Sequence, residues 1–230
     1  MHIPDGYLSP STCLTLGAVM APMWYKASQV VKRTVDIANV PFMAMGAVFS
    51  FLIMMFNVPI PDGTTAHAVG AVLLAVTVGP WVAMISVSVA LLIQALLFGD
   101  GGILAFGANA FNMAFIMPFV GYYTYKIIAK NAPMNSTRRV FAAAVAGYVG
   151  INAAAFVAAV EFGIQPLLFI SPEGTPLYSP YGLDVAIPAM MTAHLLVAGV
   201  VEAVVTGLAL KFILKTSPEL VKVETGIKGA

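Results

Sequence analysis

The chain begins MHIPDGYL, and its second residue is one of only three histidines in 230 residues. If Met1 keeps its free amine, the first dipeptide offers three nitrogen donors: that amine, the amide between residues 1 and 2, and the ring Nδ1 of His2. The amine and the amide close a five-membered ring on a metal ion, and the amide and Nδ1 close a six-membered ring. Because such a chelate is planar, these residues favour a metal ion that accepts nitrogens in a plane.

A second histidine could supply the fourth nitrogen donor of a square-planar site. His67 lies in the stretch PIPDGTTAHAVG, and one of its ring nitrogens would be the fourth donor. Ni(II) and Cu(II) prefer square-planar nitrogen sites, whereas Zn(II), Mg(II) and Ca(II) are disfavoured because ionising a backbone amide needs a strongly polarising transition metal. The alternative is a solvated His2 and a structural His67 at the start of a helix that Thr64 and Thr65 cap. We predict Met1, His2 and His67 as metal ligands.

The composition indicates that membrane helices must position these residues. The chain is 60% hydrophobic and 9% charged, with a mean hydropathy of +0.93, which lies outside the range of soluble domains. Its long apolar runs do not alternate, so they favour helices over a barrel. We predict an all-α polytopic bundle of about seven transmembrane helices, near residues 11–31, 39–57, 66–79, 81–98, 105–129, 139–162 and 186–214.

The domain organisation follows from the same pattern. We expect one integral membrane metal-binding domain over 1–230, with a chelating N-terminal segment at 1–10 and a cytoplasmic tail at 215–230. No basic residue precedes Lys26, and the first apolar run follows a polar opening, so we expect no cleavable signal and a retained N-terminus. The segment 66–79 is short for a membrane span of about 20 residues.

Charge predicts the orientation of the bundle. If the segments alternate, every basic residue falls on one side, which the positive-inside rule makes cytoplasmic. The N-terminus, Asp62, Asp100 and the segment 163–185 fall on the outer side. The basic residues are Lys26, Lys32, Arg33, Lys126, Lys130, Arg138, Arg139, Lys211, Lys215, Lys222 and Lys228.

Four motifs together resemble one family. The stretches MHIPDG, NVPIPDGTTAHAVG, QALLFGDGG followed by GANAFNM, and IPAMMTAHLLVAGVVEAVVTG are similar to the CbiM/NikM family over residues 1–214. Members of this family are the substrate-binding (S) components of energy-coupling-factor (ECF) cobalt and nickel transporters. The resemblance implies that Met1, His2 and His67 are the metal ligands, and that Ni(II) or Co(II) is the transported substrate with no organic cofactor.

The resemblance also implies a function and a set of partners. It implies high-affinity capture of the ion at the outer face of the cell membrane, followed by delivery across it as a subunit of an ATP-driven uptake transporter. The implied partners are a membrane coupling (T) protein, a pair of cytoplasmic ATPases and often a small accessory membrane subunit. The chain has no GxxxxGK[ST] loop, so ATP hydrolysis would come from the partners. The net charge of +1 gives no indication of nucleic acid.

Several polar residues could support the metal ligands. Gln94, Asn109 and Asn112 could orient the N-terminal loop or hydrogen-bond the ring of His67, or they could simply link helices. Asp5 and Asp100, like Asp62, could attract cations to the outer mouth or be ordinary loop acids.

Two further observations leave alternatives open. His194 and Glu202 are ionisable residues two turns apart in the last apolar segment, where we expect a packed histidine and no direct metal ligand. Met113 and Met117 form a thioether pair of the kind that binds Cu(I), so a copper-handling membrane protein is the alternative function. An enzyme is disfavoured because the sequence contains no HExxH motif.

Overall fold

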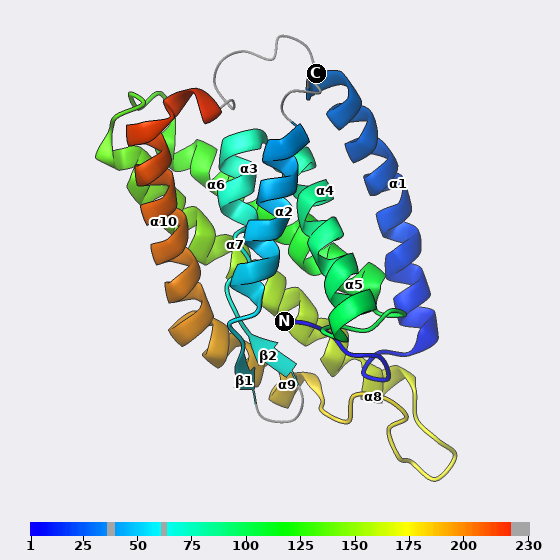
Figure 1. Ribbon diagram of the computed structural model, residues 1–230. Coiled ribbons are helices and arrows are strands. Elements are labelled where there is room, and N and C mark those ends of the chain that lie inside the picture. Colours follow the sequence, from blue (N-terminus) through cyan, green and yellow to red (C-terminus); the bar gives the residue numbers. More distant parts are fainter. Residues whose placement is uncertain (36–39, 61–63, 222–230) are drawn as a thin grey trace.

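The helices of the protein run side by side in a bundle (Figure 1). The computed structural model describes residues 1–35, 40–60 and 64–221. Within these residues the α-helices are α1 (Pro10–Thr34), α2 (Val40–Met54), α3 (Ala71–Val78), α4 (Pro80–Ile93), α5 (Phe106–Ala110), α6 (Met117–Ala129), α7 (Thr137–Gly163), α8 (Gln165–Leu168), α9 (Leu183–Ala193) and α10 (Gly199–Thr216). A short 3-10 turn, η5 (Pro218–Leu220), follows α10.

In the described part of the chain, three helical bodies contain a π-helical turn. The turn η2 (Gln94–Phe98) continues α4, η3 (Phe111–Ile116) joins α5 to α6, and η4 (His194–Ala198) joins α9 to α10. The helices at Pro80–Phe98, Thr137–Leu168 and Leu183–Thr216 are long and apolar enough to cross a membrane. The predicted helical membrane fold is therefore confirmed in outline.

The predicted helix at 66–79 is wrong in its first part. Residues Thr64–Ala66 form strand β2, which pairs antiparallel with β1 (Val58–Ile60), with Val58 opposite Ala66. The two threonines favour this strand because they are β-branched, so they do not cap a helix as predicted. The helix starts only at Ala71, after Gly70 at φ +73°, a left-handed conformation that suits glycine. His67 therefore lies in a connection between strand and helix.

The first three residues of the N-terminal segment are buried in the bundle, whereas Asp5 and Gly6 further along it are exposed. Met1 and Ile3 are fully buried, and the N-terminus lies beside the hairpin in the interior of the drawn bundle (Figure 1). Ser9 ends this segment by capping α1, since its Oγ accepts a hydrogen bond from the Thr12 amide at 3.1 Å. This cap marks where the N-terminal segment ends and the first helix begins.

Small residues allow the helices to pack closely around α7. This helix contacts α6, α9 and α10 and buries a row of alanines and glycines along its length. Such residues let helix backbones approach each other in a membrane. The predicted tail at 215–230 begins inside α10 and η5, and its residues 222–230 lie outside the described part of the chain, as does Asp62.

Candidate metal centre

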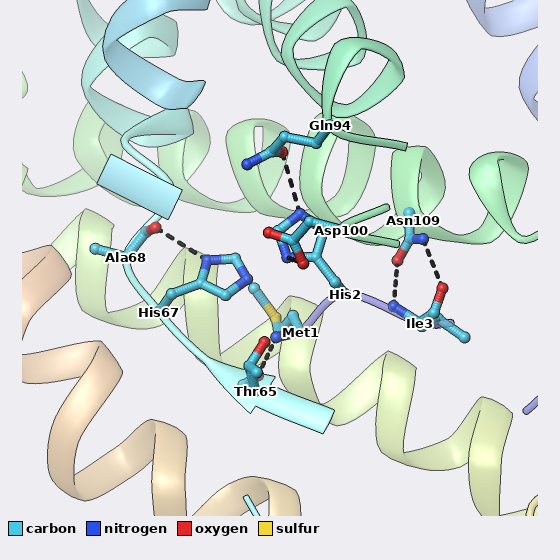
Figure 2. A network of polar contacts seen from close by, with 9 residues as sticks. All are labelled: Met1, His2, Ile3, Thr65, His67, Ala68, Gln94, Asp100 and Asn109. Atoms are coloured by element: carbon cyan, nitrogen blue, oxygen red, sulfur yellow. Dashed lines mark hydrogen bonds and ion pairs between the residues drawn. The ribbon is translucent and has the colours of Figure 1, made fainter. Parts of the chain in front are cut away.

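Met1, His2 and His67 are brought together, as predicted, in the interior of the bundle. The rings of His2 and His67 are stacked, with their centroids 4.6 Å apart and an angle of 26° between their planes. The Met1 amine donates a hydrogen bond to the Thr65 carbonyl on β2, next to His67 (Figure 2). The exposed fractions of Met1, His2 and His67 are 0%, 4% and 2%. The centre is therefore shielded from solvent.

His67 presents a buried ring nitrogen whose lone pair is not used by any described group. Its Nδ1 lies 3.1 Å from the carbonyl oxygen of Ala68, to which it can only donate. Nε2 then carries the lone pair; it is buried, and no group in the described residues hydrogen-bonds to it. Burial, reinforced by the Met1 amine and by His2, holds the pKa of His67 well below its ordinary value of 6.5. The ring is therefore neutral at physiological pH.

His2 lies between an amide and a carboxylate. Its Nε2 is 3.1 Å from Gln94 Oε1, and its Nδ1 is 3.3 Å from Asp100 Oδ1 (Figure 2). Burial lowers the pKa of His2 to about 3, an effect that the nearby Met1 amine strengthens and the hydrogen bond with Gln94 opposes. Because the ring is neutral, the contact with Asp100 is not an ion pair between opposite charges.

The Met1 amine is also neutral. Burial lowers its pKa from 8.0 to about 4, although the charge of Asp100 acts in the opposite direction. Burial in turn raises the pKa of Asp100, which is only partly shielded because 29% of its side chain is exposed. All of these groups lie outside the membrane-spanning helices. The centre thus gathers three uncharged nitrogen groups beside one carboxyl group.

Asn109 clamps the main chain of the N-terminal segment. Its Oδ1 accepts from the Ile3 amide at 2.8 Å, and its Nδ2 donates to the Ile3 carbonyl at 3.0 Å (Figure 2). The amide of Gly102 donates to the same carbonyl at 2.9 Å. Of the alternatives left open by the sequence, Asn109 and Gln94 therefore contact the N-terminal segment. Asn112 instead links helices, because its Nδ2 donates to Glu161 Oε2 at 2.8 Å.

Asp5, one of the acids that could attract cations, also has a structural role in the protein. Its carboxylate accepts hydrogen bonds from the amides of Ile103 and Ala105, each at 3.0 Å. Further along, the Gln165 side-chain oxygen accepts from the Ser9 amide at 3.0 Å. These contacts hold the N-terminal segment against the loop before α5 and against α8. Sequence reasoning did not single out Gln165 or Glu161, and no motif marks them.

Glu202 holds the segment that carries His67. Its carboxylate accepts hydrogen bonds from the amides of Val69 and Gly70, at 2.7 and 3.0 Å from Oε2, and from the Thr206 hydroxyl at 3.3 Å. The Ser50 hydroxyl of α2 donates to the Val69 carbonyl at 2.8 Å. Glu202 could be singled out in the sequence because it is an isolated acid in an apolar helix. The sequence did not indicate which groups its carboxylate binds.

The remaining candidates lie in the packed interior. Met113 and Met117 are fully buried members of the hydrophobic core, as expected for methionines at helical spacing. In the described part of the chain, no three His, Cys, Asp or Glu side chains are grouped so that they could hold a metal ion by themselves.

The fold and this centre define a helical membrane protein with a buried, nitrogen-rich N-terminus. The sequence pattern of the CbiM family, described as the cobalt uptake substrate-specific transmembrane region, matches residues 2–220. The chain belongs to this family, and it is a multi-pass membrane protein.

Similar proteins agree with this assignment. A "Probable fused nickel transport protein LarMN" of Lactiplantibacillus plantarum is 55% identical over 95% of the chain, and a "Fused nickel transport protein NikMN" of Rhodobacter capsulatus is 52% identical over 96%. The chain spans only 66% and 63% of the lengths of these two relatives. A crystal structure described as a truncated transition metal transporter is 61% identical, with a TM-score of 0.90, and the match covers 94% of this chain and 99% of that one.

Proposed function

We propose that this chain captures Ni(II) or Co(II) with high affinity at the outer face of the membrane, through four nitrogens of Met1, His2 and His67. This proposal requires that Met1 be the first residue of the mature protein. The donors are the terminal amine, the amide nitrogen and Nδ1 of His2, and Nε2 of His67. The observation that carries this proposal is the convergence of these groups, neutral and buried, in one place.

The spacing of the two rings supports planar binding. The amide nitrogen is the middle donor of the chelate, so the fourth ligand lies opposite it and beside Nδ1 of His2. Two imidazoles at adjacent corners of a square, with metal–nitrogen bonds of about 2 Å, place their ring centroids roughly 4.4 Å apart. The rings of His2 and His67 have a separation of 4.6 Å.

The surrounding groups fit the same role. When Gln94 accepts from Nε2 of His2, Nδ1 keeps its lone pair, and the hydrogen bond from Nδ1 of His67 to Ala68 frees Nε2 in the same way. The positive charge of a divalent ion would be balanced by the ionised amide and by the carboxylate of Asp100, whose Oδ1 is 3.3 Å from His2. A balanced charge reduces the desolvation cost of the buried ion.

Delivery across the membrane is the second part of the proposal. We assign the chain as the substrate-specific (S) subunit of an ECF-type transporter, with a coupling (T) protein, two cytoplasmic ATPases and a small accessory membrane subunit as partners. The relatives named as fused nickel transport proteins extend beyond the region that this chain matches, which supports a further membrane component. The names of these relatives and the planar donor set favour nickel over cobalt. The copper alternative has less support, because Met113 and Met117 are fully packed.

A change at the N-terminus tests the capture site. One residue added before Met1, or acetylation of its amine, keeps every side chain and removes or displaces the donor that closes the five-membered ring. We expect loss of tight Ni(II) binding and of the visible absorption band of planar Ni(II), with little change in melting temperature without metal.

The control is the unmodified chain, whose first residue is verified by mass spectrometry. If the extended and acetylated proteins bind Ni(II) with the original affinity and spectrum, the N-terminal chelate is wrong.

A further inference from the structure

The imidazole of His194 is buried with one ring nitrogen that no described group satisfies. His194 is 0% exposed, and its Nδ1 lies 2.8 Å from the Met190 carbonyl, to which it donates. Its Nε2 therefore carries a lone pair; this atom is buried, and among the described residues it has no hydrogen-bond partner. His67 has the same arrangement, with Nδ1 bound to a neighbouring carbonyl and Nε2 unsatisfied.

His194 belongs to the same part of the interior as the metal centre. It begins the π-helical turn η4, which contacts β2, the strand that leads directly into His67. His194 also contributes, as the smallest of several causes, to the lowered pKa of His67. His194 is thus linked to the segment of His67 through the contact between η4 and β2, without being one of the four proposed donors.

We propose that His194 is a further ligand of the transported ion, which its Nε2 binds as the ion enters or leaves the four-nitrogen centre. This inference rests on the proposed function. The described side chains contain no ready-made cluster of three metal-binding groups, so His194 does not complete a static site with His2 and His67. Its role is instead that of the entering nitrogen during ligand exchange.

The way in which planar metal ions exchange ligands explains why such a nitrogen would be useful. A planar Ni(II) centre exchanges ligands by association: a new donor binds above the plane before an old bond breaks. Here the bond from Nε2 of His194 to the metal would form first, and a bond to one of the four nitrogens would then break. No electron is transferred, and the amide nitrogen regains one proton from water when the ion leaves it. A soft or borderline imidazole suits both Ni(II) and Co(II).

The substitution His194→Asn isolates this nitrogen. The asparagine amide keeps a donor for the Met190 carbonyl and lacks the second ring nitrogen. In the detergent-solubilised full chain with a native N-terminus, association and dissociation of Ni(II) are followed by stopped-flow absorption at the planar band. We expect both rate constants to fall by about tenfold or more, with unchanged equilibrium affinity, because the four planar donors remain.

The exposed Thr192→Ala on α9 is the matched control and should leave both rates unchanged. Wild-type rates in His194→Asn, or a lower affinity with an unchanged association rate, would overturn the role of His194 while leaving the planar centre in place. Failure of the proposed capture site has a different signature, namely a planar band that is absent from the native chain or that survives acetylation. His194→Gln, which also lacks the lone-pair nitrogen, replaces the asparagine variant if that variant does not fold.

Discussion

At the level of single residues, the burial of the Met1 amine changes how metal binding depends on pH. An exposed amine with a pKa of 8.0 would be protonated at neutral pH and would compete with the ion. Burial instead lowers the pKa of the amine to about 4 and that of His2 to about 3, so both donors are already deprotonated. Only the amide between residues 1 and 2 still has a proton to lose.

This state of the donors gives a quantitative prediction. Between about pH 6 and 8, Ni(II) binding should release about one proton per ion, so affinity should rise with pH by roughly tenfold per unit. Competition by protons on the amine and rings begins only as the pH falls toward their lowered pKa values, where the slope becomes steeper. Calorimetry in two buffers with different ionisation enthalpies measures the released protons. A release close to two protons at pH 7 would mean that the amine is charged in the folded protein.

His67 supplies the second prediction at this scale. The substitution His67→Ala removes the fourth nitrogen and leaves the terminal chelate. A four-ligand site contributes roughly 10–16 kcal/mol, so one ligand is worth about 3 kcal/mol, or roughly a hundredfold in Kd. We expect this loss in Ni(II) calorimetry. The protein should remain folded without metal, with a lower melting temperature because the variant loses a buried ring and its hydrogen bond to Ala68. Wild-type affinity would remove His67 from the site.

Among the secondary-structure elements, π-helical turns contain several of the buried polar residues of the bundle. The turns η2 and η4 begin at Gln94 and His194, and η3 includes Asn112. A π-helical turn inserts a residue into a helix and is frequent at functional sites. In this bundle the π-helical turns interrupt the regular α-helical hydrogen bonding of long apolar helices at the positions of these side chains.

The helix α10 controls the position of His67 through Glu202. Because the carboxylate binds the amides of both Val69 and Gly70, Glu202→Gln removes one of two acceptor oxygens and loosens the segment. We expect Ni(II) affinity to fall by about tenfold. In a His67→Ala background the same substitution should have no further effect, since its influence passes through that residue.

Glu161→Gln is the matched control. Glu161 is also a buried carboxylate in a helix, but its side chain bonds to Asn112 and not to the segment that carries His67. Ni(II) affinity should remain unchanged in this variant. An equal loss on adding Glu202→Gln to the wild type and to His67→Ala would show that Glu202 acts on stability alone.

Across the whole molecule, the basic ends of α1 and α10 and the candidate metal centre occupy different parts of the bundle. The C-terminal ends of α1 and α10, which carry Lys32, Arg33 and Lys215, lie together at one end, and the hairpin and the segment before α9 lie at the other (Figure 1). The positive-inside rule assigns the basic end to the cytoplasm. We therefore expect seven spans with the N-terminus outside.

Cysteine labelling tests this orientation. In a Cys13→Ala background, Glu173→Cys and Asn131→Cys place single thiols at exposed positions near opposite ends of the bundle. An impermeant maleimide should label Glu173→Cys in intact cells and Asn131→Cys only after the membrane is opened. The reverse pattern would invert the orientation, and labelling of both from one side would contradict the number of spans.

The sequence by itself determined the helical membrane class and the identity of the three proposed ligands. Long apolar runs leave the backbone no other way to satisfy its hydrogen bonds in lipid, and the chelate of Met1 and His2 depends on covalent order alone. For that reason the predicted apolar segments overlap helical bodies in the described residues. The start of the helix at 66–79 was wrong, because the local preference of Thr64 and Thr65 for a strand and the left-handed Gly70 outweighed the apolar pattern.

Only the tertiary structure decided which side chains surround the ligands. Gln94, Asn109, Glu202 and Asp100 all lie far along the chain from the residues that they contact, and no spacing in the sequence relates them to residues 1–3 or 67–70. Burial of the N-terminus likewise results from the packing of the whole bundle around it. Since burial lowers the pKa values of the amine and both rings, the neutral state of the donors is a property of the fold and not of the dipeptide.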